Sequence, residues 1–539
     1  VCNTLPNSKK QITMTDSADN KPSQLLFWGC FIALITTSFG FITRMFLLDD
    51  PEVVKLLNLD PAQVGKFKGI QIWPFAISII LFSLIIDKVG YKFSMIFAAA
   101  CQIIWAIMGI IGLSIAADNP AAGANLLYWG GLVLALGNGT VEAFINPVVA
   151  TMFTKDKTKW LNILHAGWPG GLVIAGIAVI VMGPDTSWQI KTGIIIIPAV
   201  IYFLMLIGQN FPVQERVASG VSYRDMLREF GVFGALIVSL LIYLQLDAEY
   251  PGNKIPFAIL CAAMVAAFGI YTQHLGRGLM GILIVIMMPL ATTEIGTDGW
   301  ISGIMAGAVS FDPGWILVYT SVIMMGLRFL AGPIVHALQP LPLLIVSCVL
   351  AIAGLAALSG ASGTAMIFVA ATLYALGKTF FWPTMLGIVS EQTPKGGALT
   401  LNAVSGIGML AVGVLGFPLI GALQANKEIS EVSKVDAPGL VANGDLVEGA
   451  TDAKNIYSII NYSVLNADVV EEKLASASPE TKDAVQAARD GSAPKALMSM
   501  TIFPLSMLIA YIGIFMYFKS RGGYKPIEID SAGGSSSDD

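Results

Sequence analysis

Fourteen long apolar runs constrain the fold of this chain more than any other feature. A helix that crosses a lipid bilayer needs about 20 consecutive, mostly apolar residues. Such runs lie at 25–47, 66–86, 93–116, 126–153, 161–183, 193–211, 231–246, 255–273, 279–309, 314–337, 341–359, 364–390, 397–424 and 496–518. A buried core helix would explain one run, but not fourteen in one chain. The sequence therefore predicts an all-α integral membrane protein with 14 transmembrane helices.

The overall composition excludes two broad classes of function. Hydrophobic residues make up 55% of the 539 residues and charged residues only 12%, whereas soluble domains carry about 25% charge. The net charge of −5 offers no positive field for nucleic acid. A soluble enzyme and a nucleic-acid binder are therefore excluded. The five cysteines lie far apart and form no metal-binding spacing, so we expect neither a metal nor a cofactor.

Lysine and arginine predict the orientation of the chain in its membrane. Most of them fall on one side if residues 1–24 form a cytoplasmic tail, whereas short loops on the other side hold few. Positively charged loops stay in the cytoplasm, so both termini are expected there and the membrane is expected to be the plasma (inner) membrane. The polar, acidic segment 425–495 is then an extracytoplasmic insert, and residues 519–539 are a disordered cytoplasmic tail.

An internal repeat divides the membrane part into two halves. The stretch that starts at Gly137 and the stretch that starts at Gly377 both run through a helix with proline, a basic loop, a Leu-Asn pair and a glycine-rich helix. The spacing from Gly137 to Asn162 equals that from Gly377 to Asn402, at 25 residues. We expect two six-helix bundles, at 25–211 and 278–518. The linker 212–277 carries two extra helices that pack outside the bundles.

The turn after the second run resembles the signature of the major facilitator superfamily. It reads Ser83-Leu-Ile-Ile-Asp87-Lys88-Val-Gly90-Tyr-Lys92, similar to Gly-x-x-x-Asp-Arg/Lys-x-Gly-x-Arg/Lys, with Ser83 in place of the first glycine. Glycine permits the tight turn, and the aspartate is suited to cap a helix end or to pair with a cation. The resemblance implies a transporter with the major facilitator fold, gated by Asp87, Lys88 and Gly90.

Three further patches resemble the fucose/proton-symporter-like sugar transporters. They are Glu142-Ala-Phe-Ile-Asn146-Pro147, Leu161-Asn162-Ile-Leu-His165 and Glu294-Ile-Gly-Thr-Asp298-Gly-Trp300. His165 replaces the glutamine of that family, and the intramembrane aspartate of its first helix is not evident here, where Arg44 is the charge. The resemblance implies proton-coupled transport of a sugar.

Glu142 is the sharpest candidate for proton coupling. A charge inside the bilayer costs about 2.5–3.5 kcal/mol on insertion scales and marks a functional site. Asn138, Glu142 and Asn146 share one helical face, which should point into a central cavity. A buried carboxylate tends toward its neutral form, so Glu142 is suited to bind and release a proton. The alternative is a structural glutamate that never changes its protonation state.

The next helix adds Asn162, His165 and Trp168, three or six positions apart. Amide, imidazole and indole groups suit a hydroxylated ligand, and an imidazole titrates near neutral pH. The alternative is that these groups only hold helices together. Counting residues from the loop 154–160 places His165 roughly 10 Å nearer the cytoplasm than Glu142, at 1.5 Å per residue.

Charged residues in the second half leave several interpretations open. Glu294 and Asp298 lie four positions apart and suit a site for H⁺ or Na⁺, a clamp for sugar hydroxyls, or ion pairs with Arg44 or Lys378. Asp298 is otherwise a solvated residue at the outer rim, and Arg44 otherwise extends to the lipid headgroups. Arg328 is expected to serve a gate in the second half.

These patterns assign three roles to residues of the membrane part. Proton coupling is assigned to Glu142, His165, Glu294 and Asp298. Solute binding is assigned to Gln71, Asn138, Asn146, Asn162, Trp168, Trp300, Lys378, Trp382 and Asn402. Gating is assigned to Asp87, Lys88, Gly90 and Arg328.

The chain has no recognisable enzyme motif and no ATPase pattern, so any transport is secondary. The leading hypothesis is a monomeric secondary transporter that carries a sugar or similar small polar metabolite together with H⁺, or with Na⁺. A transporter of another solute class, such as an organic anion or an amino acid, is the alternative. A third hypothesis, from a different class, is a membrane sensor that binds its ligand without transport.

Overall fold

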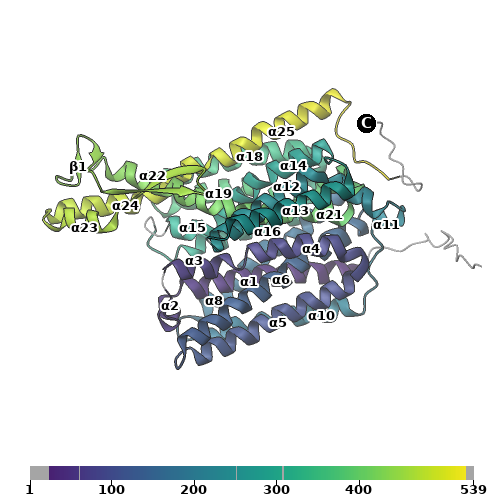
Figure 1. The fold of residues 1–539 in the computed structure, drawn as a ribbon, viewed down its shortest axis with the longest axis horizontal. Coiled ribbons are helices and arrows are strands. Elements are labelled where there is room, and N and C mark those ends of the chain that lie inside the picture. Colours follow the sequence, from purple (N-terminus) through teal and green to yellow (C-terminus); the bar gives the residue numbers. More distant parts are fainter. Residues whose placement is uncertain (1–22, 60, 251, 306–308, 530–539) are drawn as a thin grey trace, which may run out of the picture.

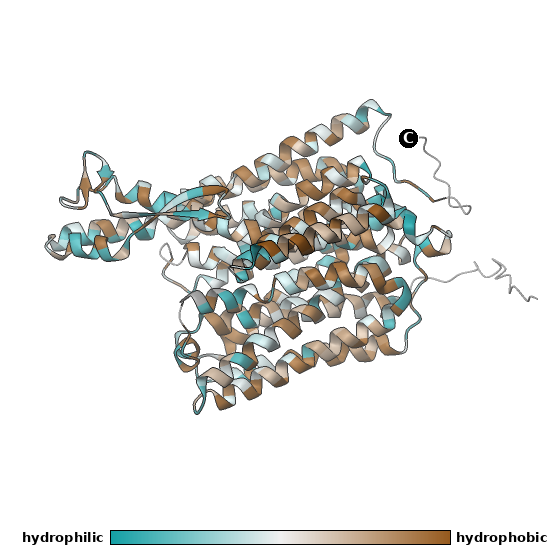
Figure 2. Ribbon diagram, viewed as in Figure 1, coloured by the Kyte–Doolittle hydropathy of each residue, from teal (hydrophilic) through white to brown (hydrophobic). Residues whose placement is uncertain are grey.

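The computed structural model describes residues 23–59, 61–250, 252–305 and 309–529. In this part of the chain, thirteen helical stretches are long and apolar enough to cross a membrane, or fourteen if the bent pair α16–α17 is one span. The fourteen apolar runs coincide with these helices apart from their ends, and residues 306–308 of the run 279–309 lie outside the described part. This agreement confirms the predicted all-α membrane fold. In Figure 2 the helices of the body are mostly brown to white, whereas teal is frequent on the segment that projects from one end.

The first bundle contains the helices of the N-terminal half. They are α1 (Gln24–Asp49), α4 (Trp73–Val89), α5 (Tyr91–Ile115), α6 (Pro120–Met152), the pair α7 (Lys157–His165) and α8 (Gly167–Met182), and the pair α9 (Trp188–Gly193) and α10 (Ile196–Ile207). Short helices α2 (Pro51–Leu56) and α3 (Pro61–Gly69) precede α4, and α11 (Glu215–Ala218) follows the bundle.

The second bundle contains more broken helices. It is built from α14 (Gly278–Ala291), η1 (Thr292–Gly296) and α15 (Thr297–Met305); α16 (Gly314–Phe329) and α17 (Ala331–Leu338); α18 (Pro340–Ser359); α19 (Thr364–Lys378) and α20 (Phe381–Gln392); η2 (Pro394–Gly396), α21 (Gly397–Ala411), η3 (Val412–Gly416) and α22 (Phe417–Val432); and α25 (Ile502–Ser520). The segments η1 and η3 are single π-helical turns, a feature that is frequent at functional sites.

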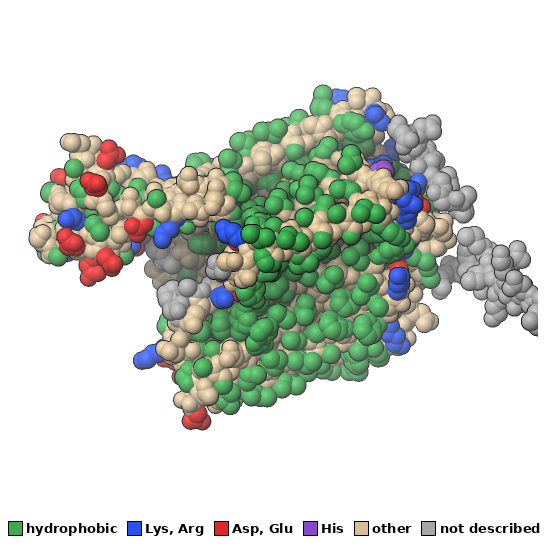
Figure 3. Space-filling view, viewed as in Figure 1, with side chains coloured by type: hydrophobic (Ala, Val, Ile, Leu, Met, Phe, Trp, Pro, Cys, Tyr) green, Lys and Arg blue, Asp and Glu red, His purple; other side chains and the backbone are tan. Residues whose placement is uncertain are grey.

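The insert projects from one end of the molecule (Figure 1). It holds two antiparallel hairpins, β1 (Val441–Ala442) with β2 (Asp445–Leu446) and β3 (Thr451–Ile456) with β4 (Ile460–Leu465), followed by α23 (Ala467–Ala475) and α24 (Pro479–Met500). Acidic side chains gather on the insert in Figure 3, whereas the body between the two ends is mostly hydrophobic. We call this end the insert side, and we call the opposite end, where α1 begins and α25 ends, the terminal side.

The two extra helices lie against the flank of the bundles, as expected. Helix α12 (Tyr223–Glu249) packs against α21 and α14, and α13 (Lys254–Thr272) packs against α12 with most of its side chains exposed. Glu249 at the end of α12 accepts a hydrogen bond from the hydroxyl of Tyr128 (3.1 Å) and pairs with Lys66 (3.2 Å), which ties α12 to the first bundle. Neither helix lines the central cavity described below.

Glycines allow the helices of the first bundle to approach closely. A Cβ at Gly139 of α6 would collide with the carbonyl oxygen of Phe75 and with the side chain of Ser78, both on α4. The hydroxyl of Ser78 also donates a hydrogen bond to the carbonyl oxygen of Leu136 (2.7 Å). Small residues at helix contacts are the usual means of close packing in membranes.

Replacing Gly139 by alanine should therefore destabilise the first bundle. Overpacking of this kind costs about 1–3 kcal/mol, and we expect the thermal unfolding temperature of the purified protein to fall. Gly513 of α25, where a Cβ would meet open space, is the matched control, so Gly513→Ala should leave that temperature unchanged. Equal stability of the two variants would contradict the assigned packing.

Candidate functional site

A small cavity lies between the two bundles. It is lined by Phe75 (α4), Glu142 (α6), His165 (α7) and Trp168 (α8) from the first half, and by Glu294 and Ile295 (η1), Arg328 (α16), Trp382 (α20) and Met409 (α21) from the second. Four of these nine side chains are charged or are histidine, and all four are buried. Buried polar groups at such a junction mark the default binding site of a membrane protein.

A chain of hydrogen bonds links Glu142 to His165. The side-chain amide of Asn146 donates to Oε2 of Glu142 (2.7 Å), and the Oδ1 atom of Asn146 lies 3.0 Å from Nε2 of His165. One carboxamide therefore separates the carboxylate from the imidazole. Glu142 and His165 share one cavity, as expected.

The depth expected for His165 is wrong because the loop between the two helices is shorter than the sequence indicated. Helix α6 ends at Met152 and α7 begins at Lys157. Glu142 lies ten positions before the end of α6, and His165 lies eight positions after the start of α7. The two side chains therefore reach a similar depth in the membrane.

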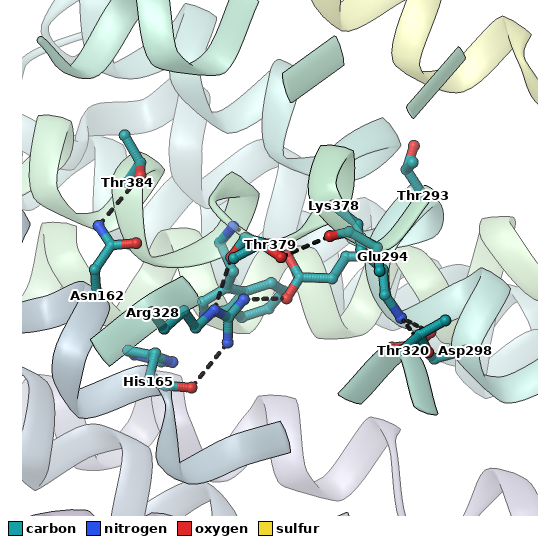
Figure 4. A network of polar contacts seen from close by, with 12 residues as sticks. Asn162, His165, Thr293, Glu294, Asp298, Thr320, Arg328, Lys378, Thr379 and Thr384 are labelled. Carbon is teal, nitrogen blue, oxygen red and sulfur yellow. Dashed lines mark hydrogen bonds and ion pairs between the residues drawn. The ribbon is translucent and has the colours of Figure 1, made fainter. Parts of the chain in front are cut away.

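Arg328 is the central cation of the site (Figure 4). Its Nε donates to the carbonyl oxygen of Thr379 (2.7 Å), one terminal nitrogen donates to the carbonyl oxygen of His165 (2.8 Å), and the other pairs with Oε1 of Glu294 (2.7 Å). The second carboxylate oxygen of Glu294 accepts the backbone N–H of Trp382 (3.0 Å). The planar guanidinium suits such a set, because its donors diverge in one plane.

Prolines explain why carbonyl oxygens are available to these donors. Proline lacks the N–H that would bond the carbonyl four positions earlier. Pro169 thus frees the carbonyl of His165, and Pro383 frees that of Thr379; both carbonyls accept from Arg328. Pro147 frees the carbonyl of Ala143, which accepts from the side-chain amide of Asn402 (2.8 Å). In a membrane such groups must be satisfied by protein.

The sequence placed Arg328 at a gate, but the structure places it in the cavity. Arg328 lies in the last turn of α16, where it pairs with Glu294, and the chain bends by 69° directly after this helix.

Lys378 and Asp298 form a second buried ion pair beside the cavity. The ammonium group also lies 3.5 Å from the hydroxyl of Thr320. Of the two partners considered for Asp298, Lys378 is therefore the one it meets. Arg44 lies elsewhere: it donates to the carbonyl oxygen of Phe67 and stacks over Trp105, within the first bundle.

The repeated asparagines cross the interface between the bundles in both directions. Asn402 of α21 reaches the Ala143 carbonyl of α6, and Asn162 of α7 donates to the hydroxyl of Thr384 in α20 (3.2 Å). Asn162 also donates to the carbonyl oxygen of Thr158 (2.9 Å). The repeat found in the sequence thus places equivalent amides at contacts between the bundles, one to a hydroxyl group and one to a backbone carbonyl.

Seven of the nine residues expected to bind solute lie outside the cavity lining. Asn138 is bonded to Gln102 (2.9 Å) and to the carbonyl oxygen of Thr37 (3.3 Å), and Gln71 contacts the sulfur of Met45 (3.0 Å). Trp300 lies on α15, and Asn162 lies on the terminal side of the cavity. Trp168 and Trp382 do line the cavity. Asn146 donates to Glu142, and Asn402 accepts from Asn146 (3.4 Å).

Polar contacts close the terminal side. Asp87 pairs with Arg216 of α11, Lys88 lies over the ring of Tyr223, and Gly90 takes a positive φ of 82° in the turn before α5. Lys157 pairs with Glu215 (2.6 Å). These contacts fix the signature turn to the linker that follows the first bundle.

Glu391 bridges the two bundles at this end, although no sequence motif marks it as a functional residue. Its Oε1 accepts from the hydroxyl (2.5 Å) and the backbone N–H (3.3 Å) of Thr158, while its Oε2 accepts from the hydroxyl of Tyr524 (2.7 Å). Asp156, the residue before α7, makes no capping bond of its own, so Glu391 caps this helix from the other bundle. Of the tail expected to be disordered, residues 521–529 therefore include an ordered strap after α25; residues 530–539 lie outside the described part.

Comparisons with known proteins agree on one family. The model of the family described as Major Facilitator Superfamily matches residues 26–417. A structure of the proton:xylose symporter XylE is 14% identical over 74% of this chain and 88% of that chain, with a TM-score of 0.54. A bacterial homolog of the human lysosomal transporter Spinster is also 14% identical, over 94% and 99%, with a TM-score of 0.56.

The transporter FucP in its outward conformation is 14% identical over 89% of this chain and 98% of that chain, with a TM-score of 0.52. At these identities the structures share the fold. No curated protein matches the sequence.

Arg328→Lys should disrupt the site while keeping its charge. A single ammonium cannot serve the two carbonyls and Glu294 in the same plane. A buried polar group left unpaired costs about 1–3 kcal/mol, so the thermal unfolding temperature should drop. Arg521→Lys, at an exposed position after α25, is the control and should show no drop.

Tyr524→Phe should loosen the terminal side. The variant keeps the ring contact with Phe518 but removes the hydrogen bond to Glu391. We expect a cysteine introduced at Ser390, which lines the pocket at this end, to react faster with a water-soluble maleimide. Tyr517→Phe, whose ring is exposed, should not change that rate, and an unchanged rate in Tyr524→Phe would argue against the strap.

Proposed function

Because the chain belongs to the major facilitator superfamily, we propose that it is a proton-coupled symporter of a sugar or a similar small polar solute. It works by alternating access: the two bundles rock about the central cavity and expose it to one side of the membrane at a time. Its cargo is a small molecule together with H⁺, and its setting is a lipid bilayer.

One observation carries the coupling role of Glu142. The three carboxylates near the cavity differ in their partners: Glu294 pairs with Arg328 and Asp298 pairs with Lys378. Among the described residues Glu142 forms no ion pair and accepts only from the neutral amide of Asn146. A cation holds a carboxylate in its ionised form, so Glu142 is the carboxylate best suited to exchange a proton. His165, one amide away, extends this path.

The cavity chemistry favours a neutral, hydroxylated solute. Arg328 and Glu294 cancel each other's charge, so the cavity becomes neutral when Glu142 is protonated. Trp168 and Trp382 supply aromatic faces, and Glu142 and His165 supply hydrogen-bonding groups. Sugars bind to such a combination. The resemblance of three sequence patches to sugar/proton symporters points to the same solute class.

A different solute class remains the alternative. An organic anion needs a cation in the cavity, and Arg328 supplies one, but Glu294 and two carbonyl groups already occupy it. An amino acid would need both a free cation and a free carboxylate. The remaining alternative is a sensor that binds solute without moving it, and uptake of solute in a transport assay would exclude this alternative.

Coupling to a proton supplies the driving force. A membrane potential contributes about 2.3 kcal/mol per charge per 100 mV. This is enough for roughly 50-fold accumulation of a neutral solute that moves with one proton.

The test begins with the solute. Thermal-shift measurements on purified protein against sugars, amino acids and organic anions identify the ligand, and proteoliposomes with a proton gradient then measure its uptake. Glu142→Gln keeps the shape and most hydrogen bonds of the side chain, so the protein should stay folded. The variant should lose proton-driven accumulation but still exchange labelled for unlabelled solute.

Glu472→Gln, exposed on the insert, is the control and should accumulate solute as the parent protein does. Normal accumulation by Glu142→Gln would eliminate the coupling role. Binding without uptake by the parent protein would favour a sensor, and a stabilising organic anion or amino acid would move the assignment to that solute class.

A further inference from the structure

We propose that Asn402 is a positioning residue that transmits the charge state of Glu142 from the first bundle to the second. This inference rests on the proposed proton-coupling role of Glu142. Asn402 does not line the cavity. Its side-chain amide nevertheless contacts Asn146, which belongs to the hydrogen-bond chain that starts at Glu142.

The hydrogen bonds of Asn146 make this transmission possible. Its side-chain nitrogen has two N–H groups. It lies 2.7 Å from Oε2 of Glu142 and 3.4 Å from Oδ1 of Asn402. The first contact lies within α6, and the second crosses to α21. One amide thus divides its donors between the proton site and the opposite bundle.

Asn402 is itself anchored on the first bundle. Its nitrogen donates to the carbonyl oxygen of Ala143 (2.8 Å), which is free because Pro147 lacks an N–H. Asn402 therefore both donates to α6 and accepts from it. It is completely buried, so water does not replace either bond. A small displacement of the Asn146 amide acts directly on a contact between the bundles.

The direction of the effect follows from the strength of hydrogen bonds to ions. A bond to an ionised carboxylate is roughly twice as strong as one between neutral groups. Ionised Glu142 therefore holds the Asn146 amide on its own helix. When Glu142 is protonated, this hold weakens and the amide is free to shorten its longer contact to Asn402.

Protonation should consequently strengthen closure on the terminal side. Asn146 lies nearer the terminal end of α6 than Glu142 does, and Asn402 lies close to the start of α21 at the same end. Loss of the proton should loosen this end. This behaviour suits a symporter, because binding of a proton without solute then keeps the terminal side closed.

Other charged groups face Glu142 and bear on its response to pH. His165 comes from α7, Glu294 from η1 and Arg328 from α16, and the pair Lys378–Asp298 lies behind them. Phe75 and Met409, from α4 and α21, add no charge. Arg328 and Glu294 hold each other, so His165 is the competing titratable group. A response to pH that came from His165 would survive in Glu142→Gln.

The experiment measures the distance between the terminal ends of the bundles. These ends touch at Asp156 and His336 (3.2 Å), so spin labels on cysteines introduced at Lys155 and Ala337 flank a contact between the bundles. Cys2 is replaced by serine, and the other four cysteines are buried. Pulsed electron resonance in nanodiscs then gives the distance at acidic and at alkaline pH, without any need to know the solute.

We expect the parent protein to shift to longer distances as pH rises. Glu142→Gln should stay at the short distance at every pH. Asn402→Ala should lose the shift and remain at the longer distance. Asn162→Ala is the matched control from the repeat: it loses an equivalent contact between the bundles, but not one connected to Asn146, and should keep the shift. Asn402→Leu keeps the side-chain size without polar atoms, and should behave as Asn402→Ala does.

The outcomes distinguish the transmitting role of Asn402 from the proton-coupling role of Glu142. If both Asn402 variants fold and keep the full shift, Asn402 does not transmit the charge state, whatever Glu142 does. If Glu142→Gln keeps the shift, the proposed proton-coupling role fails instead. If Asn162→Ala loses the shift as completely as Asn402→Ala, the effect reflects general weakening of the interface, and the specific role of Asn402 is refuted.

Discussion

The structure depends on how a chain in a membrane satisfies the carbonyl groups that proline leaves free. Pro147, Pro169 and Pro383 each remove one donor from a membrane-embedded helix, and water is not available to replace it. The replacements are Asn402, which reaches the Ala143 carbonyl, and Arg328, which takes the other two carbonyls. Two of these three bonds join the first bundle to the second. The helix breaks thus create the polar contacts that hold the bundles together around the cavity.

This arrangement also determines which buried carboxylates pair with a cation and which do not. Arg328 needs acceptors on several sides, and Glu294 completes its set from the π-helical turn η1. Lys378 fixes Asp298 in the same bundle. The second bundle therefore pairs each of its buried carboxylates near the cavity. Glu142 stands apart in the first bundle with an amide as its partner. The proposed proton site follows from this difference in partners.

The sequence predicted much of this and missed the rest for physical reasons. The apolar runs, the flanking position of α12 and α13, and the cavity shared by Glu142 and His165 follow from hydropathy and helical spacing, which are local properties. The relative depth of Glu142 and His165 did not follow, because it depends on where α6 ends and α7 begins. The role of Arg328 depends on the carbonyl groups of His165 and Thr379, and the role of Glu391 depends on residues more than a hundred positions away in the chain. The prolines were visible in the sequence. Their partners were not, because a freed carbonyl is satisfied by whichever donor the tertiary fold brings to it.

The internal repeat adds a final constraint on mechanism. Asn162 and Asn402 occupy equivalent positions, and each donates a hydrogen bond to the opposite bundle, so both halves of the repeat contribute contacts across the interface. The same alignment places Glu142 opposite Trp382. Trp382 donates its backbone N–H to Glu294 and offers no group that titrates. The repeat is therefore symmetric in the residues that close the interface and asymmetric in the residue proposed to carry the proton. Under this proposal, protonation of Glu142 in the first bundle acts on contacts to which both bundles contribute, and it therefore biases the movement of both bundles.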